Sequence, residues 1–289
     1  MNTSRLARPI RLLQHNARFE SGCFDGYHTN ALQAPGRARR NTLEETFLNM
    51  AVERSSRGVD MPEACLRTTF LLDLDDPRLR MRASSLTQFS LNDRAKALAI
   101  YAYVKRLPYT RPFKMGHRTA RDVLDSGMGD GPDKATLMIS LLRHAGVPAR
   151  MRIVRMDGQI MRGLVDLESI SWPFVEVWLD GRWIGTDTYI FDAPYMAAAR
   201  QALKDSGQQF GFGVYVNTQP LWTALESASL SPLPPQSDPM VLEDMGAYHD
   251  HDHYMGSRGF RSRHSRLGRF LHWNLLVPKI RLAVLRLRR

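Results

Sequence analysis

The chain has few of the features that mark a secreted or membrane-spanning protein. Its 289 residues include two cysteines, Cys23 and Cys65, which are too few for a disulfide framework. No apolar run near the N-terminus is fit for a signal peptide. The longest uncharged run of the C-terminal stretch, residues 270–278, is far short of the ~20 residues of a bilayer span. We therefore expect a cytoplasmic protein.

Acidic residues are absent from the C-terminal end. Residues 253–289 contain ten Lys or Arg and no Asp or Glu, and residues 1–42 contain seven Arg and two acids. Because the formal net charge of the whole chain is +11, the intervening residues 43–252 carry a charge of −4. The basic character therefore bears on what the two ends contact rather than on the ligand of the central part.

Residues 129–150, GDGPDKATLMISLLRHAGVPAR, have the pattern of a capped helix. Gly131 is the expected N-cap, Pro132 lies in the first turn, and Gly146 followed by Pro148 ends the helix. A cysteine at such an N-terminus would have a lowered pKa, because the helix dipole and the free N–H groups favour the thiolate. Gly131 offers none of this chemistry.

The dipeptide Asp180-Gly181 separates two alternating runs and predicts a β-hairpin with a two-residue turn. In the register that this turn sets, Phe174 pairs with Asp187, and Trp172 is a diagonal neighbour of Asp187 at roughly 7–8 Å. A histidine at position 172 would then be oriented by Asp187, as the base of a catalytic triad is. The indole of Trp172 can donate its N–H to the carboxylate but cannot take a proton from a thiol.

The helix and the hairpin together resemble the transglutaminase-like superfamily of cysteine acyl-transfer proteins. Members of this family carry Gly-Asp-Cys, an alanine-rich helix and Gly-Ile-Pro-Ala-Arg, followed by a His-Ala-Trp-Val-Glu-Val strand, an Asp-Gly turn and a Trp-x-x-x-Asp strand. The resemblance covers residues 68–200 and implies an α+β fold, with helices packed on an antiparallel sheet. It places the family's Cys, His and Asp at Gly131, Trp172 and Asp187, of which only Asp187 matches.

Composition, periodicity and this resemblance together predict four segments. Residues 1–60 are an N-terminal extension with a helix near 42–54, residues 61–230 are the transglutaminase-like domain, residues 231–256 are a Pro-, His- and Asp-rich linker, and residues 257–289 are a basic amphipathic tail. Within the domain, periodicity predicts helices at 93–106 and 194–205. Strands are expected at 150–156, 160–166, 174–179, 182–189 and 210–216.

Two functional hypotheses from different classes follow. In the first, the chain is a non-catalytic member of the family that binds a peptide, an amide-bearing ligand or a protein partner in the former active-site cleft. The residues expected to line that cleft are Asp130, Gly131, Trp172, Phe174 and Asp187. In the second, an amide hydrolase or acyl transferase uses relocated groups: either Asp187, Asp130 or Asp133 acts as general acid or base, or a cluster of histidines at 249–253 brings a metal to the cleft.

Other side chains near the helix start have simpler interpretations. Asp130 and Asp133 are typical of acids at a helix N-terminus, where the dipole favours them. Lys134 is expected as a solvated residue of the first turn. No cofactor is expected at these positions.

His249, His251 and His253 alternate with aspartates and would share one face of a strand. Imidazole ligands suit zinc, nickel or copper, so the cluster is a candidate site for a divalent metal. A solvated polar turn after the linker is the favoured interpretation, because motifs of this kind are permissive.

The C-terminal residues 267–289 are apolar and basic at once. One helical face carries Ile280, Ala283, Val284 and Leu287 beside Lys and Arg side chains. An interfacial helix on an anionic membrane has this composition, and it would place the protein at the inner membrane surface as an adaptor. A helix packed back on its own domain is an equal alternative. Nucleic acid is disfavoured, because the arginines accompany leucines rather than stacking aromatics.

Overall fold

The computed structural model describes residues 61–113, 116–219, 221–235, 237–263 and 274–289. The predicted N-terminal extension and its helix near 42–54 lie outside these residues. No helix in the described part of the chain has both the length and the apolar character needed to cross a bilayer.

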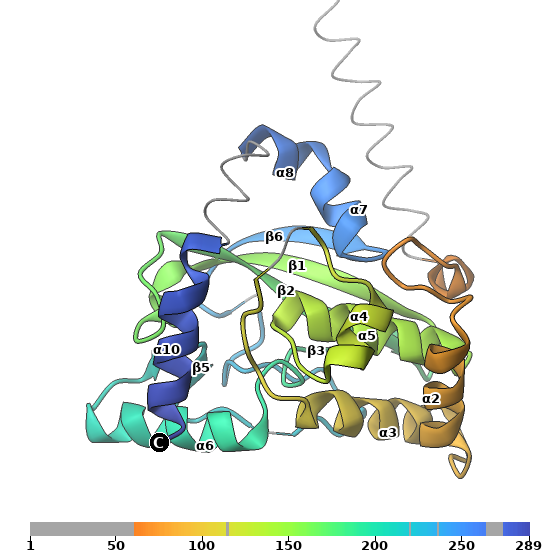
Figure 1. Ribbon diagram of the computed structural model, residues 1–289, viewed down its shortest axis with the longest axis horizontal. Helices are drawn as coiled ribbons and strands as arrows, with labels where there is room; N and C mark the ends of the chain where they lie inside the picture. Colours follow the sequence, from red (N-terminus) through yellow and green to blue (C-terminus); the bar gives the residue numbers. More distant parts are fainter. Residues whose placement is uncertain (1–60, 114–115, 220, 236, 264–273) are drawn as a thin grey trace, which may run out of the picture. The chain divides into compact units, whose positions relative to one another are not determined.

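The core is a four-stranded antiparallel sheet in the order β3-β2-β1-β6. Its strands are β1 (Ala149–Asp157), β2 (Ser169–Leu179), β3 (Arg182–Thr186) and β6 (Val241–Tyr248). The helices are α2 (Pro77–Thr87), α3 (Asp93–Arg106), α4 (Ala120–Ser126), α5 (Gly131–His144), α6 (Ala193–Asp205), α7 (His251–Gly256), α8 (Arg258–Arg263) and α10 (Val277–Leu287). Short elements complete the domain: 3-10 helices η1 (Pro62–Leu66) and η2 (Gly158–Met161), and the small hairpin of β4 (Phe210–Gly211) and β5 (Val214–Tyr215). Helices α2 to α5 lie together, with α5 against β1 and β2 (Figure 1). The α+β fold class is confirmed.

Helix α5 is the central helix of the domain. Its N-cap is Asp130 and not Gly131, which is the first helical residue. The prediction was wrong by one residue, because a carboxylate accepts the N–H of residue N3, Asp133, and a glycine cannot. Asp133 in turn accepts the N–H of Asp130, which completes a capping box.

The predicted hairpin turn is present. Leu179 pairs with Arg182, and both turn residues have positive φ, 51° at Asp180 and 77° at Gly181. The β2–β3 ladder ends at the pair of Val175 and Thr186, so the chain leaves the sheet just before Asp187. The strand expected over 182–189 is therefore shorter than predicted.

Two of the expected strands are not formed as predicted. Residues 160–166 run through η2 and turns, and residues 210–216 divide into the two-residue strands β4 and β5. The prediction of a linker at 231–256 was also wrong, because β6 and α7 lie within it. Strand β6 pairs with the edge of β1, whose backbone groups would otherwise lack a partner strand.

The C-terminal helix α10 packs against α6 (Figure 1). Val277, Ile280 and Val284 are buried, whereas Leu282 and Leu285 are more than half exposed. The Arg288 guanidinium donates to the Asp192 carboxylate, which is the N-cap of α6. The described part of the tail is therefore a helix packed on its own domain, which is one of the two alternatives considered for it.

Candidate functional site

The first residue of α5 lies where the family's nucleophile is expected. A Cβ atom built on Gly131 would come within 3.4 Å of Pro173 Cγ and 3.6 Å of Ile190 Cδ1, which are ordinary van der Waals contacts. The Tyr189 hydroxyl donates to the Pro173 carbonyl at 3.0 Å and is 3.4 Å from the Gly131 carbonyl. The backbone around Gly131 is therefore fixed, and it has room for a small side chain.

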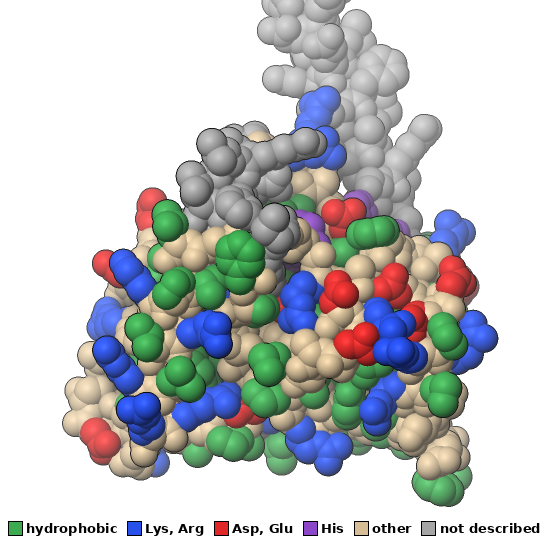
Figure 2. Space-filling model, in the orientation of Figure 1, with side chains coloured by type: hydrophobic (Ala, Val, Ile, Leu, Met, Phe, Trp, Pro, Cys, Tyr) green, Lys and Arg blue, Asp and Glu red, His purple; other side chains and the backbone are tan. Residues whose placement is uncertain are grey.

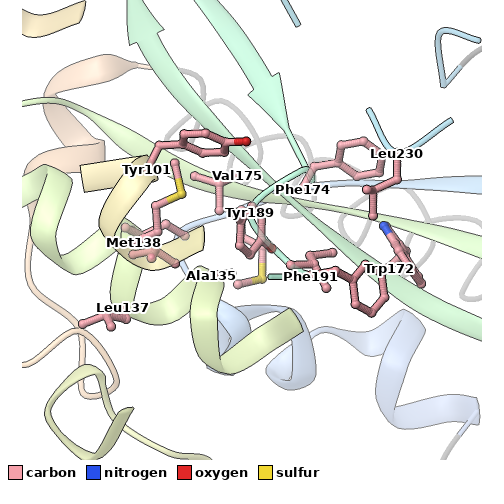
Figure 3. Close-up of a cluster of buried hydrophobic side chains, with 14 of the residues drawn as sticks. Tyr101, Ala135, Leu137, Met138, Trp172, Phe174, Val175, Tyr189, Phe191 and Leu230 are labelled. Atoms are coloured by element: carbon pink, nitrogen blue, oxygen red, sulfur yellow. The ribbon is translucent and has the colours of Figure 1, made fainter. Parts of the chain in front are cut away.

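Trp172 and Asp187 meet as the hairpin register predicts. The indole Nε1 donates to Asp187 Oδ2 at 3.2 Å, and the backbone N–H of Leu230 donates to Oδ1 at 2.6 Å. The indole nitrogen points toward the side of the cluster where Leu230 lies, and the Phe191 ring packs beside the indole at 6.2 Å (Figure 3). Asp187 is 2% exposed, and burial raises its pKa to about 7, although both hydrogen bonds oppose that rise.

Two lysines are buried in the domain, and the sequence did not reveal either; of the two, Lys105 interacts electrostatically with Asp187. Lys134 is fully buried rather than solvated, and its ammonium donates to the carbonyls of Leu107 at 3.0 Å and Ile190 at 2.9 Å. Burial lowers its pKa well below the ordinary value. Burial also lowers the pKa of Lys105 to about 8, and Asp187 opposes that fall. Lys105 donates to the Thr188 carbonyl at 2.5 Å.

A cavity of about 500 Å³ opens at the start of α5. Asp130, Gly131 and Trp172 line it, as the sequence predicts. Phe174 and Asp187 do not; they face a separate, much smaller cavity on the other side of Trp172. The five residues expected in one cleft are thus divided between two cavities, and Trp172 lines both of them.

The walls of the larger cavity are both apolar and polar, and a few of the side chains that line it are charged. Segments outside the predicted core supply part of the wall, including Tyr254 and Phe260 near α7 and α8, and Ile280 of α10. The cations that line it are Arg111 and Arg155. On the face seen in Figure 2, Lys and Arg side chains are spread among acidic and apolar ones rather than gathered in one patch.

The three C-terminal histidines do not lie on one strand. His249 follows the end of β6, and His251 and His253 lie in α7. The rings of His249 and His253 stack at 5.4 Å, whereas the His251 ring meets that of His117 at 5.3 Å. Among the described residues, no three His, Cys, Asp or Glu side chains are placed to hold a metal ion. The strand geometry proposed for a metal site is therefore wrong.

Comparison with known families identifies the central part of the chain. The family model described as the transglutaminase-like superfamily matches residues 80–188. Those residues form a transglutaminase-like domain, and they include Gly131, Trp172 and Asp187. Among curated proteins, none matches the chain.

Several solved structures are similar to part of the chain. A candidate cysteine protease from Cytophaga hutchinsonii is 23% identical over 47% of this chain and 43% of its own, with a TM-score of 0.37. The periplasmic domain of TgpA from Pseudomonas aeruginosa, bound to ethylmercury, is 24% identical over 47% of this chain and 50% of its own, with a TM-score of 0.35. A candidate protease from Parabacteroides distasonis is 23% identical over 43% of this chain and 26% of its own, with a TM-score of 0.30. The chain thus spans half or less of the length of each.

Proposed function

We propose that this chain is a non-catalytic transglutaminase-like protein that uses the cleft at the start of α5 to bind a ligand. The observation that carries the proposal is the pair of substitutions at the family's nucleophile and base positions, Gly131 and Trp172. Acyl transfer through a covalent intermediate needs a nucleophile in contact with a base. Glycine has no nucleophilic atom, and an indole N–H is a donor only.

The remaining acids near the site are engaged in other contacts. Asp187 is buried behind Trp172 and faces a different cavity. Asp130 and Asp133 hold each other's backbone N–H groups in the capping box. These arrangements favour the binding function over an amide hydrolase or acyl transferase with relocated groups.

The cleft itself has the size of a ligand site. A volume of about 500 Å³ lies within the range of ~300–1,000 Å³ that is typical of small-ligand pockets. A peptide, an amide-bearing compound or a segment of a partner protein fits a cleft of this kind. We place this binding in the cytoplasm, on the ground that two cysteines do not form a disulfide framework.

The experiment that tests this proposal introduces a cysteine at position 131 and a histidine at position 172. We expect Gly131→Cys with Trp172→His to react with chloroacetamide at position 131 at least about tenfold faster at pH 7 than Gly131→Cys alone, because an adjacent imidazole lowers a thiol pKa. Mass spectrometry of the digested protein locates the label, which separates position 131 from Cys23 and Cys65.

Two results would contradict the proposal. Equal rates for the double and single variants, with both folded by circular dichroism, would show that positions 131 and 172 do not form a nucleophile–base pair. Turnover of an amide substrate by the wild-type protein, lost on Asp187→Asn, would show that catalysis persists through relocated groups.

A further inference from the structure

One edge of β2 faces the cavity. Five consecutive residues, 169–173, line it. Successive side chains of a strand point to opposite faces of the sheet. A cavity that touches all five residues therefore reaches the edge of the strand, and Arg155 of β1 and Met245 of β6 extend it across one face of the sheet.

That edge has no partner strand within the described residues. Strand β1 pairs with β2 over residues 169–177, whereas β3, on the other side, pairs only over 175–179. The N–H of Trp178 donates to the Pro148 carbonyl, so even-numbered residues of β2 direct their backbone groups toward β1. The backbone groups of Ser169 and Ser171 consequently point away from β1, toward the cavity side.

The edge is also limited in extent. Pro173 has no N–H to donate, and its carbonyl already accepts the Tyr189 hydroxyl. The open backbone groups are therefore those of Ser169 and Ser171, enough for one short extended segment. Unpaired strand edges of this kind accept peptides by β-augmentation.

The charged side chains of the cavity wall determine which end of a bound peptide would lie beside them. Arg155 is paired with Glu243 at 3.1 Å, and the Asp130 carboxylate accepts an N–H of its own helix. Arg111 is partly buried and has no ion pair within the part of the chain that the structure describes. It lies beside the start of α5, because Thr110 donates to the Gly129 carbonyl at 3.1 Å. Among the described residues that line the cavity, Arg111 is thus a cation without a carboxylate partner, and the Asp130 carboxylate is an acid of the same wall.

We propose that the cleft binds the carboxyl-terminal end of an extended apolar peptide, with its backbone on the open edge of β2 and its terminal carboxylate on Arg111. The apolar walls receive the last side chains. This inference rests on the proposed binding function and names its ligand class. A hydrocarbon carboxylate would satisfy Arg111 and the walls but would leave the backbone groups of Ser169 and Ser171 unpaired, which favours the peptide.

The probe is a pool of N-terminally fluorescein-labelled hexapeptides whose last four residues are drawn from Ala, Val, Leu, Ile and Phe. Free-acid and C-terminally amidated forms are compared by fluorescence anisotropy with the full chain. We expect the free acids to bind at least about tenfold more tightly, which is typical of a charge-assisted hydrogen bond. Arg111→Gln should bring the two peptide forms to equal affinity. Arg281 is exposed on α10, so Arg281→Gln should leave the ratio of the two affinities unchanged.

Hydrogen exchange tests the edge independently. The free-acid peptide should protect the amides of Ser169 and Ser171, whereas dodecanoate at saturating concentration should not. Equal affinity of the two forms for the wild-type protein would overturn the carboxylate assignment. Binding without protection of these amides would overturn the edge assignment, and binding of dodecanoate with no peptide of the pool would overturn the ligand class. Cleavage of a bound peptide, detected by its mass, would instead refute the non-catalytic function and leave terminal recognition standing.

Discussion

The buried carboxyl of Asp187 makes the stability of this fold fall as pH rises. Burial raises its pKa to about 7, against about 3.9 for an unfolded chain. Between these two values the folded protein holds a proton that the unfolded chain has released. The free energy of unfolding therefore decreases with rising pH, by about 1.4 kcal/mol for each pH unit and by about 4 kcal/mol over the whole window from pH 4 to 7. Below pH 4 this contribution is fully present, and above pH 7 it is lost.

Asp187→Asn removes this titration. Its amide oxygen can still accept the N–H of Leu230, but its NH₂ group then faces the indole N–H of Trp172, a cost that does not vary with pH. The slopes with pH are therefore compared rather than the absolute stabilities. From pH 5 to pH 8 the wild type should lose about 2–3 kcal/mol more than the variant.

Urea unfolding followed by tryptophan fluorescence measures this difference. For a domain of this size, 2–3 kcal/mol corresponds to a midpoint change of about 1 M urea. Asp205→Asn is the matched control, because Asp205 is exposed at the end of α6 and should keep the wild-type slope. If wild type and Asp187→Asn have the same slope, the carboxyl is ionised in the folded protein and its burial does not dominate its pKa.

Two further predictions concern the buried lysine and the C-terminal helix. Lys134→Ala should lower the free energy of unfolding by about 2–4 kcal/mol, because it leaves a cavity and two carbonyls without their donor, whereas Lys204→Ala on the surface of α6 should change it by less than about 0.5 kcal/mol. Deletion of residues 257–289 should lower the melting temperature, because α10 buries Val277, Ile280 and Val284. Since that apolar face is already packed, anionic vesicles should sediment the full and shortened chains equally; loss of sedimentation on deletion would favour the membrane hypothesis.

Elements with strong local signals were predicted well. Helix α3 has the predicted bounds, because Asn92 caps its first turn and apolar side chains recur at helical spacing. The turn at Asp180-Gly181 formed because those two residue types tolerate positive φ. The contact between Trp172 and Asp187 then followed from the register, and the structure confirms it.

Features that depend on distant segments were not predicted. Lys134 has a helical position that is compatible with solvent, and its burial becomes evident only when the carbonyls of Leu107 and Ile190 converge on it. Strand β6 follows a proline-rich stretch, and its assignment needs the free edge of β1. The wall that α8 and α10 add to the cavity likewise comes from tertiary packing, which no local periodicity encodes.

Positions 131 and 172 differ from the rest of the proposed binding site in what they contribute to it. The catalysis that the resemblance implies would depend on side chains at positions 131 and 172, whereas the proposed peptide binding depends on the backbone of β2. Trp172 keeps the Asp187 carboxylate in place by donating to it, and the van der Waals space around Gly131 still admits a Cβ. In the proposed function, the reacting groups are therefore absent at these two positions, and the strand edge beside them is retained. The proposed binding on that edge therefore requires neither a nucleophile nor a base.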